Sequence, residues 1–197
     1  MSNNVTRIDE IIPGLWLGGD DHCNKHKIKK MGFTAVVCIG SVKGSHAKIS
    51  KRYVNVFALR FPDHETHHIT KKEINDVVDF IHKNLNKAGV VLVHCHKGIS
   101  RSATFVIAYL IKYEGYTDEA AIDLVHARHP NTNPNQGFRE QLDDWNNKLF
   151  VMEYGGDDKD GNGRRDTHHH NFRDRGELSS SDSSSSDSSS YSSSNSS

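Results

Sequence analysis

Cysteine is scarce in this chain of 197 residues, which contains only Cys23, Cys38 and Cys95. An odd number of cysteines is not typical of a disulfide framework, and residues 1–4 contain no apolar signal region. We therefore expect free thiols in a reducing compartment and a cytoplasmic location. The sequence does not decide whether the protein also enters the nucleus. Long apolar runs are also missing. Because none approaches the roughly 18 residues that a membrane-spanning helix needs, we predict no membrane span.

Large apolar side chains are rare at the C-terminal end. Hydrophobic residues make up 35% of the whole chain, but residues 155–197 contain only Phe172, Leu178 and Tyr191 as large apolar or aromatic residues. Fifteen of the last nineteen residues are serine. Such a segment cannot bury enough surface to offset the entropy lost on ordering, so we predict a disordered tail over residues 155–197. The folded domain is predicted over residues 5–154, after a short N-terminal segment, 1–4.

An excess of charge of one sign is absent as well, because 25 Lys and Arg balance 25 Asp and Glu. The balance hides a split between the two parts of the chain. Residues 1–154 contain 20 basic and 17 acidic side chains, a net charge of +3, whereas residues 155–197 contain 5 and 8, a net charge of −3. A slightly basic domain suits an anionic substrate, but a charge of +3 is too small to indicate a nucleic-acid partner.

The pattern of apolar residues predicts strands and helices in alternation. Strands are expected at residues 15–18, 34–39, 53–59 and 90–93. Helices are expected at residues 25–31, 71–85, 103–111 and 118–129, and the last helix carries Phe138, Leu142, Trp145 and Leu149. Thr70 and Glu73 have the spacing of a capping box at the start of the second helix. This order favours an α/β fold with a mostly parallel central sheet flanked by helices.

One loop, between the strand at 90–93 and the helix at 103–111, carries most of the chemical information. Its residues are His94-Cys95-His96-Lys97-Gly98-Ile99-Ser100-Arg101-Ser102. The N-terminus of a helix offers free backbone N–H groups and a partial positive charge, which suits a phosphate group. The same field, with Arg101 close by, favours a thiolate over a thiol at Cys95. A nucleophilic sulfur within a phosphate-binding loop indicates phosphoryl transfer to cysteine.

Each residue of the loop then has an expected role. Phosphate oxygens would be bound by the backbone N–H groups of His96, Lys97, Gly98, Ile99, Ser100 and Arg101. The guanidinium of Arg101 would add a bidentate clamp, and Cys95 would attack the phosphorus atom. Ser102 would donate its hydroxyl to the sulfur, and Gly98 allows a tight turn. We expect His94 to orient the backbone of Cys95 rather than to act as a base.

A general acid must come from another part of the chain. The segment Phe61-Pro62-Asp63-His64-Glu65-Thr66 follows the predicted strand at 53–59. Because it lies at the end of that strand, it can border the same rim as the cysteine loop. Asp63 and Glu65 are both candidates, since a carboxylic acid can protonate a leaving oxygen where its surroundings favour the protonated form.

The motif His-Cys-x-x-Gly-x-x-Arg-Ser resembles the active-site loop of the cysteine-dependent protein tyrosine phosphatases, and residues 5–150 resemble the small, atypical dual-specificity phosphatases. Three more segments carry the resemblance: 15–18, 102–110 and the final-helix start at 133–142. The resemblance implies a protein-tyrosine-phosphatase-like fold, Asp63 rather than Glu65 as the acid, and a supporting role for Asn135. It also implies catalysis without a cofactor or metal, a shallow pocket, a phosphoprotein substrate that contains phosphotyrosine or phosphoserine and phosphothreonine, and a monomer.

Two other functions stay open at this point. Lys97 stands where many members of that family have a small residue, and this hints at a more acidic substrate. With the basic segment at 25–30, it supports the alternative of a phosphatase acting on phosphoinositides or RNA 5′-phosphates. The other alternative is a scaffold that binds phosphate without hydrolysing it.

Several further patterns have simpler interpretations. We expect His64, His67 and His68, and likewise His168, His169 and His170, to be solvated rather than metal ligands. The calcium-loop-like start at 158–163 fails at later positions. Cys38 is expected to be a buried strand residue, and the sequence does not show whether Cys23 lies near Cys95. Ser179 and Ser184 each precede an aspartate by three residues, which predicts a kinase that modifies the tail.

Overall fold

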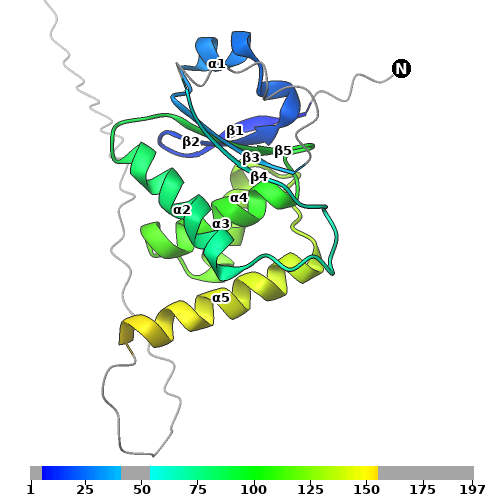
Figure 1. The fold of residues 1–197 in the computed structure, drawn as a ribbon, viewed down its shortest axis with the longest axis vertical. Coiled ribbons are helices and arrows are strands. Elements are labelled where there is room, and N and C mark those ends of the chain that lie inside the picture. The colour runs from blue at the N-terminus through cyan, green and yellow to red at the C-terminus, as the bar shows by residue number, and fades with distance from the viewer. Residues whose placement is uncertain (1–5, 41–53, 155–197) are drawn as a thin grey trace, which may run out of the picture. The chain divides into compact units, whose positions relative to one another are not determined.

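The computed structural model describes residues 6–40 and 54–154, and within them a five-stranded sheet forms the centre of the domain (Figure 1). The strands are β1 (Ile8–Ile12), β2 (Leu15–Gly19), β3 (Ala35–Ile39), β4 (Asn55–Leu59) and β5 (Val91–Cys95). Their order across the sheet is β1-β2-β5-β3-β4. Strands β2, β5, β3 and β4 are parallel, and β1 pairs antiparallel with β2. The predicted mostly parallel sheet is therefore confirmed.

Helices cover both faces of the sheet. Figure 1 shows α2 (Lys71–Leu85), α3 (Arg101–Glu114), α4 (Asp118–Arg128) and α5 (Gln136–Tyr154) on one side and α1 (Lys25–Met31) on the other. The larger apolar core lies on the four-helix side, where α3 packs against the sheet with every residue from Arg101 to Ile111 buried. A smaller core below α1 joins Cys23, Ile28 and Phe33 to the sheet. The predicted α/β class is thus confirmed, with helices on both faces of the sheet.

Local sequence signals explain where the helices begin. Thr70 accepts a hydrogen bond from the N–H of Glu73, and the Glu73 carboxylate accepts one from the N–H of Thr70, so the predicted capping box is present. A cap of this kind contributes about 1 kcal/mol.

The apolar face of α2 is buried as its spacing predicted, with Ile74, Val77, Val78 and Ile81 inside and Leu85 partly covered. In α4, by contrast, Ile122 is 38% exposed.

Strand β1 was missed by the sequence analysis, which placed the first strand at residues 15–18. It is an edge strand in which only Ile11 is buried, and it contains Asp9 and Glu10, so it lacks the apolar run of an inner strand. It turns into β2 at Pro13 and Gly14, where Gly14 has a φ of +82°. Of the predicted strand at 53–59, Tyr53 lies outside the described residues, and the strand begins at Asn55, after a bend at Val54.

Some predicted features fall on positions that the structure does not describe. These are the segment 1–4, the tail 155–197, the calcium-loop-like sequence, His168, His169 and His170, and the serines at 179 and 184. Helix α5 ends at Tyr154, the last described residue. Over the ranges 6–40 and 54–154, no helix is long and apolar enough to cross a membrane.

Candidate active site

The four parallel strands end at the same edge of the sheet, and the predicted site residues gather there. Strand β5 ends at Cys95 and its neighbour β2 at Gly19, while β3 and β4 end at Ile39 and Leu59. In open α/β sheets this carboxyl edge is where ligands bind, because the loops that follow the strands converge there. The loop after β5 contains the cysteine motif, and the loop after β4 contains Asp63.

The loop after β5 curves around the sulfur of Cys95. The backbone N–H of Gly98 lies 3.2 Å from Cys95 Sγ, and the hydroxyl of Ser102 donates to the same sulfur over 3.2 Å. Gly98 has a φ of +78°, and a Cβ there would lie 2.6 Å from the carbonyl carbon of Gly18. The turn therefore requires glycine both for its conformation and for its close contact with β2. Two donors directed at one sulfur stabilise negative charge on it.

Arg101 begins α3 and is nearly buried, with 9% of its surface exposed. Its Nη1 donates to the carbonyl oxygen of Phe61 over 3.1 Å, and its Nε lies 3.5 Å from Oδ2 of Asp63. Gly40, at the end of β3, has a φ of +122°, and a Cβ there would lie 2.2 Å from Nη1 of Arg101. Gly40 thus makes room for the guanidinium. The sequence analysis missed this role, although the position of a glycine directly after a strand was a signal.

Asp63 is held at the rim by residues from two other loops. Its Oδ1 accepts hydrogen bonds from the hydroxyl of Ser100 over 2.7 Å and from Nδ2 of Asn135 over 3.0 Å. Asn135 also caps α5, because its Oδ1 accepts from the N–H of Phe138 over 3.0 Å. The structure therefore brings the predicted supporting residue Asn135 into direct contact with the acid candidate.

The second acid candidate, Glu65, lies elsewhere. It is exposed and lines a separate shallow cavity that includes Thr66 and Gly137, whereas Asp63 and Cys95 line one cavity together. A Cβ at Gly137 would lie 1.9 Å from the carbonyl oxygen of Glu65, so the loop packs directly against the start of α5. This contact fixes the backbone near Glu65 and leaves its side chain outside the cavity that holds the sulfur.

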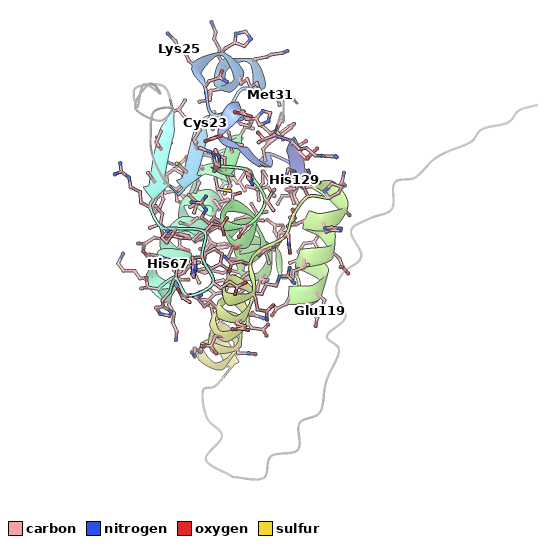
Figure 2. All side chains as sticks on the ribbon, turned by 90° about the vertical axis from the view of Figure 1, so that its right-hand side faces the viewer. Cys23, Lys25, Met31, His67, Glu119 and His129 are labelled. Carbon is pink, nitrogen blue, oxygen red and sulfur yellow. The ribbon has the colours of Figure 1, made fainter. Side chains whose placement is uncertain are left out.

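The histidines of this loop differ from one another. His64 and His68 are exposed, as expected for solvated residues. His67 departs from the expectation, because its ring stacks on Phe61 with centroids 4.6 Å apart and is only partly exposed. Figure 2 shows His67 on the loop between β4 and α2. Within the described part of the chain, no group of three or more His, Cys, Asp or Glu side chains is placed to hold a metal ion.

His94 and His96, on either side of the cysteine, have different surroundings. His94 is 1% exposed, and its Nδ1 lies 3.4 Å from the carbonyl oxygen of Cys95. His96 is exposed, and its Nδ1 lies 2.8 Å from Oδ2 of Asp20. The N–H of Asp20 also donates to the carbonyl oxygen of His96 over 3.2 Å. Asp20 was not singled out from the sequence, although it directly follows the strand at 15–19.

The site is an open cavity of about 370 Å³. It is lined by Asp63, Cys95, His96, Lys97, Ile99, Ser100 and Arg101. All of the predicted phosphate-binding residues line this cavity except Gly98, which is buried. The arrangement can bind an anion beside a sulfur, with one carboxyl group at the rim.

The other two cysteines lie in a different environment. Cys23 is fully buried in the smaller core, and Figure 2 shows it at the sheet side of α1. Burial raises the pKa of Cys23 to about 12, and the nearby Cys38 adds to this. Burial likewise raises the pKa of Cys38 to about 12, with a further contribution from Cys95. Cys38 aligns with His94 across the sheet, and side chains alternate along a strand, so Cys38 and Cys95 point to opposite faces.

Comparison with known proteins places this site in a family. Residues 15–148 match the family described as dual specificity phosphatase, catalytic domain. The MAP kinase phosphatase with leucine-rich repeats protein 3 of Dictyostelium discoideum is 40% identical over 149 residues, which are 74% of this chain and 17% of that protein. The human dual specificity protein phosphatase 26 is 36% identical over 148 residues, 68% of this chain and 64% of that protein. The chain therefore spans less than two thirds of these relatives.

Solved structures show the same fold. The human tyrosine phosphatase-like serine/threonine/tyrosine-interacting protein is 32% identical with a TM-score of 0.66, and the match covers 73% of this chain and 97% of that one. Human DUSP28, at 23% identity, has a TM-score of 0.66 over 73% of this chain and 99% of that chain.

Proposed function

Because this chain belongs to the dual specificity phosphatase family, we propose that it hydrolyses phosphotyrosine and phosphoserine or phosphothreonine in proteins through a phosphocysteine intermediate. One observation carries the proposal: the Cys95 sulfur receives two hydrogen-bond donors at 3.2 Å in a cavity that also contains Arg101 and Asp63. A sulfur placed in this way is supported as a nucleophile, since it lies where an anion can bind and the two donors can stabilise it as a leaving group.

In the first step, Cys95 Sγ attacks phosphorus in line with the leaving oxygen, so that an S–P bond forms and the P–O bond to the substrate breaks. The backbone N–H groups of the loop and the guanidinium of Arg101 bind the three equatorial oxygens as their charge develops. To do this, Arg101 exchanges its contact with the Phe61 carbonyl for the phosphate. Asp63 at the rim donates a proton to the leaving oxygen.

In the second step, Asp63 accepts a proton from a water molecule that attacks the phosphocysteine, which releases inorganic phosphate and restores the sulfur. The hydroxyl of Ser102 stabilises the departing thiolate, because it already donates to Sγ. The bonds from Ser100 and Asn135 keep the Asp63 carboxyl at the rim through both steps. The chemistry proceeds with this chain's own residues, and we propose that the domain acts as a monomer.

The decisive experiment is hydrolysis of an aryl phosphate and of phosphopeptides by the purified chain, with a reductant and a chelator present. We expect turnover of both, and mass spectrometry of acid-quenched enzyme should find one phosphate on the peptide that contains Cys95. Hydrolysis without any phosphocysteine would contradict the mechanism. A panel that adds phosphoinositides and RNA 5′-phosphates tests the substrate class, because faster hydrolysis of either than of any phosphopeptide would contradict a protein substrate.

A second candidate is a scaffold that recognises phosphate without turnover. It is favoured by the 32% identity to the human tyrosine phosphatase-like serine/threonine/tyrosine-interacting protein. Complete absence of aryl phosphate hydrolysis, together with tight phosphopeptide binding, would establish the scaffold and refute the enzyme. Separately, we propose that a kinase modifies Ser179 and Ser184 and makes the tail more anionic. Treating the chain with an acidophilic kinase before the assay tests this proposal.

A further inference from the structure

A second cavity lies beside the one that contains Cys95. It also measures about 370 Å³, and the two cavities share the residues His96, Lys97 and Ile99. Its remaining wall is formed by Thr6, Arg7, Asp20, Asp21, His129 and Asn131. A phosphoresidue that reaches Cys95 through the first cavity therefore has a neighbouring hollow in which the adjacent part of its own chain can lie.

We propose that Lys97 is a specificity-determining residue, which binds the carboxylate of an aspartate or glutamate next to the phosphoresidue. The substrate class is then a phosphoprotein with an acidic residue beside its phosphorylated side chain. This inference rests on the function proposed above and deepens it, because it names what the loop recognises besides the phosphate.

The charged residues that line the second cavity differ in the partners that they already have. The carboxylate of Asp20 lies 2.8 Å from His96 Nδ1, and that of Asp21 accepts from the hydroxyl of Thr6 over 3.2 Å. Arg7 and His129, which line the same cavity, both lie beside Asp9. Both basic side chains therefore already have an acidic neighbour, whereas Asp21 accepts only from a neutral hydroxyl.

Lys97 is the exception. It is exposed, and among residues 6–40 and 54–154 it has neither a hydrogen bond nor an ion pair. An incoming carboxylate thus meets, in Lys97, a cation that has no anionic partner of its own among the described residues. Lysine binds as a compact point charge, so both aspartate and glutamate are suitable partners.

The backbone that carries Lys97 is held in place. Asp20 binds the preceding residue twice, through its N–H to the His96 carbonyl and through its carboxylate to the ring. The following residue, Gly98, packs against Gly18. Only the side chain of Lys97 must be ordered when a ligand binds. An exposed ion pair of this kind changes affinity about two- to fivefold, and salt weakens it.

The test compares three versions of one phosphotyrosine peptide, with Glu, Gln or Lys next to the phosphotyrosine, placed first on one side and then on the other. The readout is the ratio of kcat/KM for the Glu peptide to that for the Gln peptide. For at least one side we expect a ratio of about two to five at low salt. At about 1 M salt, where charges separated by more than about 3 Å are screened, the ratio should approach one.

Variants assign the preference to Lys97. Lys97→Gln should bring the ratio to about one, and Lys97→Glu should reverse it in favour of the Lys peptide. Each ratio compares two peptides on the same variant, so a general change in the phosphate loop cancels. Lys83→Gln removes an exposed lysine from α2, away from both cavities, and is the matched control that should keep the wild-type ratio.

Three results would overturn the inference or separate it from the proposed function. Equal rates on all three peptides would refute the role of Lys97 while leaving the phosphatase intact. A preference that survives in Lys97→Gln would assign it to another residue. If no peptide is hydrolysed, the proposed function fails. Fluorescence anisotropy of the same peptides bound to Cys95→Ser still measures the ratio of Kd for the Glu peptide to Kd for the Gln peptide. A ratio of one would then refute the role of Lys97 independently of hydrolysis.

Discussion

Buried cysteines occur both at the end of β5 and in the layer between α1 and the sheet. The surroundings of the sulfur atom differ between these two regions. Cys95 is 3% exposed, Cys38 is 2% and Cys23 is 0%, so burial does not distinguish them. Cys95 receives an N–H and an O–H donor, whereas burial raises the pKa of Cys23 and Cys38 to about 12. The difference teaches that depth alone does not make a sulfur suited to attack an anion, and that Cys95 differs in lining a cavity together with Arg101.

Two carboxyl groups in different parts of the domain can be compared as well. Asp63 at the carboxyl edge of the sheet has donors from Ser100 and Asn135. Asp118, at the start of α4, accepts a hydrogen bond from Nδ2 of Asn146 and also lies beside another carboxyl group. Burial, together with a hydrogen bond and repulsion from Asp143, raises the pKa of Asp118 to about 7. Both acids therefore accept a hydrogen bond from an asparagine amide, and they differ in that Asp118 also lies beside a second carboxyl group.

The largest effect is expected from exchanging Cys95, the cysteine at the end of β5. Cys95→Ser should lower kcat by at least about a thousandfold, because the hydroxyl cannot replace the thiolate as a nucleophile. Phosphopeptide binding should persist, since the backbone N–H groups and Arg101 remain. Cys38→Ala is the matched control and should keep kcat within about twofold. Comparable losses in both variants would show that the two regions do not differ in function.

A large effect is also expected at the acid. Asp63→Asn should lower kcat by about a hundredfold or more for alkyl phosphates, whose leaving oxygens need a proton, and by less for a nitrophenyl phosphate. Glu65→Gln, in the same loop but outside the cavity, is the control. The assignment of the acid would be wrong if Glu65→Gln had the larger effect on alkyl phosphates.

Alkylation compares the three cysteines directly. Iodoacetate at pH 7 should modify Cys95 at least about a hundred times faster than the other two, since a thiol with a pKa of about 12 is ionised at that pH to only about one part in 10⁵. Inorganic phosphate should slow the modification of Cys95. Peptide mass spectrometry measures each site, and equal labelling of Cys38 in the folded protein would contradict the comparison.

The smallest effect concerns the pair of acids between α4 and α5. Because the pKa of Asp118 is raised, its contribution to stability is present below about pH 4 and is lost as the pH rises through about 7. Asp143→Asn removes the repulsion, so the free energy of unfolding at pH 8 should increase by about 1 kcal/mol, or a few degrees in Tm. At pH 4 the gain should vanish. Differential scanning calorimetry checks this, and an equal gain at both pH values would refute the coupling.

Much of this protein follows from short stretches of sequence. The spacing of apolar residues predicted the four parallel strands and the five helices, and Thr70 and Glu73 marked the start of α2. The cysteine loop was recognised as a unit because its nucleophile, its arginine and its serine lie within eight consecutive residues. These features depend on interactions between residues close in sequence, which spacing reveals directly. Strand β1 was missed because an edge strand buries only one side chain and leaves little periodicity.

The tertiary structure decided the contacts between segments that are distant in the chain. The residues themselves left Asp63 and Glu65 as equal candidates, and only the fold brings Ser100 and Asn135 to Asp63. The space that Gly40 leaves for Arg101, the pairing of Asp20 with His96, and the isolation of Lys97 arise in the same way. Each depends on which strand ends are neighbours at the edge of the sheet. That order is fixed by the packing of the whole core, so no local pattern encodes it.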